Sequence, residues 1–245
     1  MVIAESLSVL GLGFLLGVTH AFDTDHMVAV TTLVSKHRNI KKASLFGAFW
    51  GLGHTSTLFL VGLFILIFKI SIPEKIALSL EFLVGMMIVV LGASVIKDIF
   101  ISKKHIHSHT HGKNTHIHIH SHKNLKQNEK HDTAAHNIMS HKKYHKPFLV
   151  GIIHGLAGSA ALMLLILSTI NSIFIGIFYI LIFGIGSVIG MSVISGLISI
   201  PFIYTSKFKR FDFWNKRFRY IAGSIGILFG MFLMIKISFF EGLIF

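Results

Sequence analysis

The sequence contains no cysteine, which excludes disulfide bonds, thiolate metal sites and thiol redox chemistry. It is also short of charge, because no Asp, Glu, Lys or Arg occurs from Pro147 to Ser206. A helix that crosses a bilayer needs about 20 apolar residues, so this run is long enough for two such helices and a turn. The three prolines lie near the ends of apolar segments, where a missing backbone N–H is tolerated. We therefore expect an all-α, polytopic membrane protein.

Hydrophobic residues make up 53% of the chain and the mean hydropathy is +0.72. Six apolar segments are long enough to span a membrane, and a histidine-rich loop at 99–146 separates them into two groups of three. The first transmembrane repeat is 1–98, with spans at 6–34, 44–68 and 76–97. The second is 147–245, with spans at 147–168, 173–203 and 219–240.

Short sequences in the two halves match at a nearly constant offset. The matches are GVTHA at 17–21 with GIIHG at 151–155, WGLGHT at 50–55 with FGIGSV at 183–188, and Gly85 and Gly92 with Gly223 and Gly230. Because three spans is an odd number, a duplicated half would insert with the opposite orientation. We therefore expect two inverted three-helix repeats, an arrangement typical of secondary transporters.

Basic residues are concentrated in alternate loops. Of the 23 Lys and Arg residues, 20 fall within 35–43, 97–146 and 207–219. By the positive-inside rule these loops are cytoplasmic and both termini lie outside the plasma membrane. The net charge of +13 is then explained by the basic cytoplasmic loops, and nucleic acid is not an expected partner.

The first span carries polar residues that are costly in a membrane, in the sequence HAFDTDH at 20–26. An Asp at the centre of a transmembrane helix costs about 2.5–3.5 kcal/mol on insertion, so Asp23 and Asp25 need compensation. On a regular helix His20, Asp23 and His26 would share a stripe, and Asp25 would point about 140° away from His20. A site that includes His20, Asp25 and His26 therefore requires local unwinding or a ligand from another helix.

Two further histidines, His54 and His154, are expected at a similar depth in the second and fourth spans. The predicted metal ligands are His20, Asp23, Asp25, His26, His54 and His154. Imidazole suits nickel, cobalt, copper and zinc, and the absence of cysteine disfavours copper(I). Two alternatives stay open: His154 as a hydrogen-bond partner between helices, and Asp23 as a residue that fixes an imidazole tautomer.

The loop contains HIHSHTHGKNTHIHIHSH at 105–122, with little to bury, so we expect disorder. Alternate histidines in an extended chain point the same way, so neighbouring pairs can chelate a divalent ion weakly. The candidate ligands are His105, His107, His109, His111, His116, His118, His120 and His122. A solvated linker and a proton-sensing linker are the alternatives.

These motifs resemble the nickel/cobalt transporter family. HAFDTDH fits its H-x4-D-H signature with His20, Asp25 and His26, and GLGHTSTLF is similar to its second motif with His54. HGLAGSAAL at 154–162 resembles the shorter, urease-accessory-type branch. The resemblance implies a nickel or cobalt permease whose signature residues are needed for metal passage. Longer members of the family have eight spans and acidic motifs in their second half, which this chain lacks.

We accordingly expect a secondary transporter that moves Ni2+ or Co2+ inward, with no resident cofactor and no enzymatic activity. Efflux and zinc transport are the alternatives within transport. A membrane haem protein or an intramembrane enzyme is a remote alternative, since the sequence has no H-E-x-x-H motif. The expected partners are the metal ion, the bilayer and a cytoplasmic metallochaperone, and the oligomeric state is left open.

Overall fold

A computed structural model describes residues 2–37, 39–70, 72–101, 105–111, 114–120, 144–156, 170, 172–204 and 211–243. The described chain is mainly helical, as expected. Its helices are α1 (Val2–His20), α2 (Thr24–Val34), α3 (Ile40–Phe68), α4 (Glu74–Ile101), α6 (His145–Leu156), α8 (Ile173–Tyr204), α9 (Phe211–Ile235) and the short π-helix η4 (Lys236–Phe240). Two strands, β1 (His105–His111) and β2 (Asn114–His120), complete it.

Within the described part of the chain, four long helices are apolar enough to cross a membrane: α3, α4, α8, and α9 continued by η4. A fifth candidate is the pair α1 and α2, which bend by 53° across a short break and can together form one span. The continuous first span that the sequence suggested is therefore broken. Of the expected fourth span, α6 covers the beginning, and 157–169 lie outside the described residues. The structure thus supports a multi-pass membrane protein without confirming six spans.

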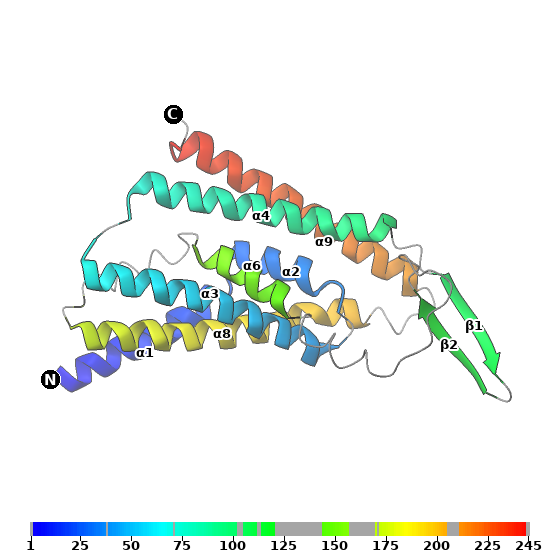
Figure 1. Ribbon diagram of the computed structural model, residues 1–245, viewed down its shortest axis with the longest axis horizontal. Coiled ribbons are helices and arrows are strands. Elements are labelled where there is room, and N and C mark those ends of the chain that lie inside the picture. The colour runs from blue at the N-terminus through cyan, green and yellow to red at the C-terminus, as the bar shows by residue number, and fades with distance from the viewer. Residues whose placement is uncertain are drawn as a thin grey trace, which may run out of the picture.

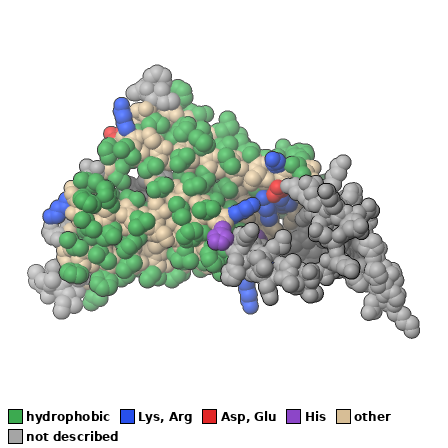
Figure 2. Space-filling model, viewed as in Figure 1, with side chains coloured by type: hydrophobic (Ala, Val, Ile, Leu, Met, Phe, Trp, Pro, Cys, Tyr) green, Lys and Arg blue, Asp and Glu red, His purple; other side chains and the backbone are tan. Residues whose placement is uncertain are grey.

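The surface agrees with a membrane setting. Figure 2 shows hydrophobic side chains over most of the visible helical body, whereas Lys and Arg side chains lie toward its two ends. Large apolar side chains such as Phe174, Phe178 and Leu228 are more than half exposed. An apolar surface of this extent is expected against lipid rather than water.

The long helices run side by side, with the N- and C-terminal ends of the chain at one end of the molecule and the β1–β2 hairpin at the other (Figure 1). Helix α3 packs against α8 and α6, α8 packs against α1, and α4 packs against α9. The α3–α8 pair is antiparallel, because Gly47 lies against Met191 and Gly184 against Thr55. The short helices α2 and α6 lie in the middle of the molecule (Figure 1).

Glycines in the two halves make reciprocal contacts. A Cβ added to any of four glycines would overlap the backbone carbonyl oxygen of a facing helix. The four contacts are Gly17 with Phe183, Gly151 with Trp50, Gly53 with Phe148, and Gly186 with Phe14. Adding 134 to the number of Gly17 gives Gly151, and subtracting 133 from that of Phe183 gives Trp50, so the first contact corresponds to the second in the sequence repeat. The third contact corresponds to the fourth in the same way. The same holds between α4 and α9, where Gly92 lies against Gly223 and Gly230 against Gly85.

Part of the histidine-rich loop, for which we expected disorder, forms an antiparallel hairpin of β1 and β2. Its register pairs His105 with His120, His107 with His118, and His109 with His116. Alternation at period two and the β-branched residues between the histidines favour strands. His122 and the rest of the loop up to residue 143 lie outside the described residues.

Candidate metal centre

The polar cluster is built at the break between α1 and α2. The chain makes turn-like hydrogen bonds there, with the backbone N–H of Phe22 donating to the Thr19 carbonyl (2.9 Å) and that of Asp23 to the His20 carbonyl (3.1 Å). These bonds satisfy backbone groups that the membrane cannot solvate. The break redirects the chain so that His20, at the end of α1, and His26, in the first turns of α2, lie together.

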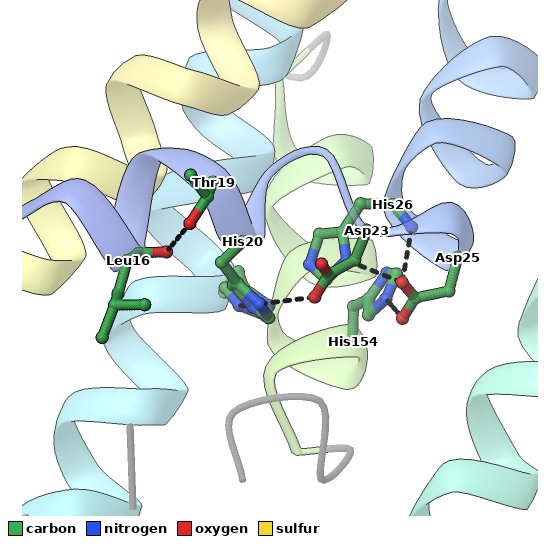
Figure 3. A network of polar contacts seen from close by, with 8 residues as sticks. Leu16, Thr19, His20, Asp23, Asp25, His26 and His154 are labelled. Atoms are coloured by element: carbon green, nitrogen blue, oxygen red, sulfur yellow. Dashed lines mark hydrogen bonds and ion pairs between the residues drawn. The ribbon is translucent and has the colours of Figure 1, made fainter. Parts of the chain in front are cut away.

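Asp23 occupies the position before α2 that usually caps a helix, but its side chain makes no capping hydrogen bond. It instead accepts a hydrogen bond from His20, with 2.8 Å between Oδ2 and Nδ1. Asp25 lies in the first turn of α2, where the helix dipole stabilises a negative charge. Both aspartates therefore have a structural partner, and both face the histidines (Figure 3).

Four imidazoles converge from three parts of the chain: His20 and His26 from α1 and α2, His54 from α3, and His154 from α6. His26, His54 and His154 are fully buried and His20 is 6% exposed. The ring of His26 is central, with centroid distances of 4.2 Å to His154, 4.5 Å to His20 and 5.0 Å to His54. This convergence is the one expected from the sequence.

Asp25 joins two of these imidazoles. Its Oδ1 lies 3.0 Å from His26 Nδ1 and its Oδ2 lies 2.9 Å from His154 Nε2. On the other side of the cluster, Nε2 of His20 lies 3.0 Å from Nε2 of His54. Figure 3 shows the labelled histidines and aspartates pointing toward one another.

Among the residues that the structure describes, two groups of three place one ligand atom each within 4.8 Å of one another. The first is His20, His26 and His54, and the second is Asp25, His26 and His154. His26 belongs to both, and its Nε2 is buried with no hydrogen-bond partner among the described residues. Such an atom is costly unless something binds it.

The remaining predicted ligands lie at the edge of the cluster or away from it. Asp23 contacts the cluster through His20, and its side chain is 45% exposed. His105, His107, His109, His111, His116, His118 and His120 lie on the hairpin, at one end of the molecule (Figure 1). They form a separate group from the buried cluster.

Sequence reasoning missed the aromatic neighbours of the cluster. The ring of Trp50 lies 5.4 Å from those of both His26 and His154. The ring of Phe183 lies 5.6 Å from that of His20. A signal was present, because Trp50 and Phe183 begin the matching sequences WGLGHT and FGIGSV.

Comparisons with known proteins identify the family of the chain. A sequence model of the NicO family, described as high-affinity nickel-transport protein, matches residues 6–235. The urease accessory protein UreH of Bacillus sp. (strain TB-90) is 40% identical over 241 residues, which cover 98% of this chain and 96% of that protein. No solved structure matched the chain. The chain therefore belongs to the NicO family of high-affinity nickel-transport proteins, and it is a membrane transport protein rather than an enzyme.

Proposed function

We propose that this protein is a permease that moves Ni2+ or Co2+ inward across the plasma membrane through the buried histidine–aspartate cluster. The observation that carries the proposal is His26, whose buried and unpartnered Nε2 lies among the side chains of two donor sets. Family membership supports transport of nickel or cobalt, and the cluster supplies ligands suited to both ions.

His20 and His54 face each other, with 3.0 Å between their Nε2 atoms, which is an ordinary hydrogen-bond distance. Without an ion, the same two atoms share one proton, which metal binding must displace.

The aspartates orient the ligands. When Asp23 accepts from Nδ1 of His20 and Asp25 from Nδ1 of His26, the Nε2 of each ring is free to bind an ion. Carboxylates commonly fix metal-binding histidines in this way. Their negative charge also offsets that of a dication in a medium of low dielectric constant.

Two adjacent ion positions follow from the two donor sets. An ion held by His20, His26 and His54 can pass to Asp25 and His154 while His26 remains a ligand. Keeping one ligand throughout lowers the barrier, because the ion is never left without protein donors after it has shed water. We propose that the histidines of the β1–β2 hairpin, from His105 to His120, hold ions weakly outside this path.

The membrane arrangement supports alternating access. Reciprocal glycine contacts between the halves favour two inverted repeats of three spans, which would rock about the cluster. Both chain ends lie opposite the hairpin (Figure 1), and the basic loops favour a cytoplasmic hairpin with both termini outside. The relative is named as a urease accessory protein, so we propose that imported metal serves an intracellular enzyme of that kind, through a cytoplasmic metallochaperone.

Direction is tested by accumulation of radioactive nickel in cells that express the protein. Expression should raise cellular nickel, and excess Co2+ should reduce the uptake more than excess Zn2+ does. Cells with lowered nickel would establish efflux instead. Equal accumulation of zinc in the absence of nickel would favour a zinc carrier.

A further inference from the structure

Two buried aromatic residues cover the candidate metal centre from opposite sides. Helices α3 and α8 are antiparallel, with Gly184 level with Thr55 and Val188 level with Gly51. Phe183 thus lies about six residues from Trp50 along α3, or about 9 Å at 1.5 Å per residue. His54, four residues after Trp50, falls between them.

The two aromatic residues contact different histidines. Phe183 contacts His20, with 5.6 Å between the ring centroids. Trp50 contacts His26 and His154, each at 5.4 Å. Trp50 is fully buried and Phe183 is 3% exposed, so both rings are packed inside the protein.

Behind each ring lies a separate apolar cluster. Phe183 packs with Leu58, Leu66, Tyr179 and Ile180 toward the Phe68 end of α3. Trp50 belongs to a cluster with Val34, Ala43, Met191 and others, which extends toward the Ile40 end. A hydrated dication cannot cross apolar packing of this kind, and hydrophobic constrictions are an established means of gating.

The same local motif builds the contacts of Phe183 with α1 and those of Trp50 with α6. On α1, Gly17 lies against the Phe183 carbonyl and His20 follows three residues later; on α6, Gly151 lies against the Trp50 carbonyl and His154 follows three residues later. In both, a G-x-x-H segment holds the backbone of an aromatic residue at its glycine and meets the aromatic ring at its histidine. The match between the halves extends from the sequence to these contacts.

We propose that Phe183 and Trp50 are paired gates that close the metal centre toward opposite faces of the membrane. The inference rests on the proposed transport function and assigns its two barriers. With the topology proposed above, Phe183 is the outer gate and Trp50 the cytoplasmic gate. Opening one gate while the other stays closed gives an ion access from one side at a time, as alternating access requires.

A single cysteine provides the test, since the natural chain has none. Ser187 is fully buried, and its Oγ has no hydrogen-bond partner among the described residues. It lies one helical turn beyond Phe183, between the levels of the two gates, and matches His54 in the sequence repeat. Ser187→Cys is labelled with a membrane-impermeant cationic methanethiosulfonate, from outside in cells and from the cytoplasmic side in inverted vesicles.

With both gates intact, labelling should be slow from either side. Phe183→Ala should accelerate labelling at least tenfold from outside only, and Trp50→Ala should do so from the cytoplasmic side only. Phe178→Ala on α8 and Phe64→Ala on α3 remove aromatic rings that are 56% and 53% exposed, and they should change neither rate. Labelling that stays slow in both gate variants, or that rises from both sides in each, would overturn the proposal.

The milder variants Phe183→Leu and Trp50→Phe guard against misfolding and should shift the same rates in the same directions by smaller factors. Labelling requires no metal, so it reports the gates independently of the transport function. Loss of the side-specific pattern in variants that still bind Ni2+ would refute the gates alone. Unchanged Ni2+ uptake after His26→Ala would refute the proposed function alone.

Discussion

Replacing Asp25 with asparagine should weaken nickel binding while leaving the fold intact. Asp25 accepts hydrogen bonds from two imidazoles, through Oδ1 from His26 and through Oδ2 from His154. An asparagine of nearly the same shape presents one acceptor and one donor. One of the two histidines must then meet an N–H group and change its tautomer, and the negative charge beside the ion is lost.

The magnitude follows from this geometry. If His26 changes its tautomer, its proton moves to Nε2, the atom that we propose binds metal, and this proton must leave before an ion can bind. Removing carboxylate partners of metal-binding histidines typically costs 10–100-fold in affinity or activity, which corresponds to about 1.4–2.7 kcal/mol. Because Asp25 serves two imidazoles and carries charge, we expect the upper part of that range. Isothermal titration of purified protein in detergent with Ni2+ measures it.

Asp98→Asn is the matched control. Asp98 is a half-exposed carboxylate on α4 that pairs with Lys36, away from the cluster, and its replacement should leave nickel affinity within about twofold of the wild type. An Asp25→Asn protein that binds Ni2+ as tightly as the Asp98→Asn control would refute the reasoning.

Three further predictions concern packing, pH and the loop. Gly151→Ala places a Cβ against the Trp50 carbonyl and should destabilise the protein by about 1–3 kcal/mol. Gly11→Ala, with open space around it, should be neutral or stabilising. Thermal unfolding in detergent compares the two variants, and equal effects would count against this packing. Nickel uptake should fall as pH falls, because protons compete for the ring nitrogens. An initial rate that stays flat down to the lowest pH at which the protein remains folded would contradict this prediction. Deletion of 105–122 should leave uptake measurable but weaker at low nickel, and complete loss would exclude a storage role.

Much of the membrane architecture could be predicted from composition. The uncharged run from Pro147 to Ser206 required buried or lipid-facing helices, and α8 fills most of it. For a single site at 20–26, the sequence required either local unwinding or a ligand from another helix, and the structure has a break there between α1 and α2. Both predictions rest on large energies, namely the cost of polar groups in a membrane.

Other features were not predicted, either because a sequence signal was outweighed by another or because they depend on packing. The hairpin was missed because low hydrophobicity argued for disorder, while the period-two alternation that pairs His107 with His118 argued for strands. The role of Asp25 as a link to His154 was not foreseen, since the two residues are separated by 129 positions. Convergence of the histidines could be expected from their depth, but which imidazole lies at the centre depends on the 53° bend.

Uptake of Ni2+ into proteoliposomes that contain only this protein tests the central claim most directly. Wild-type protein should accumulate Ni2+, with competition by Co2+ stronger than by Zn2+. His26→Ala should abolish uptake, because it removes a donor from both sets, and His37→Ala, a histidine outside the cluster, should not. Wild-type uptake by the His26→Ala protein would contradict the account.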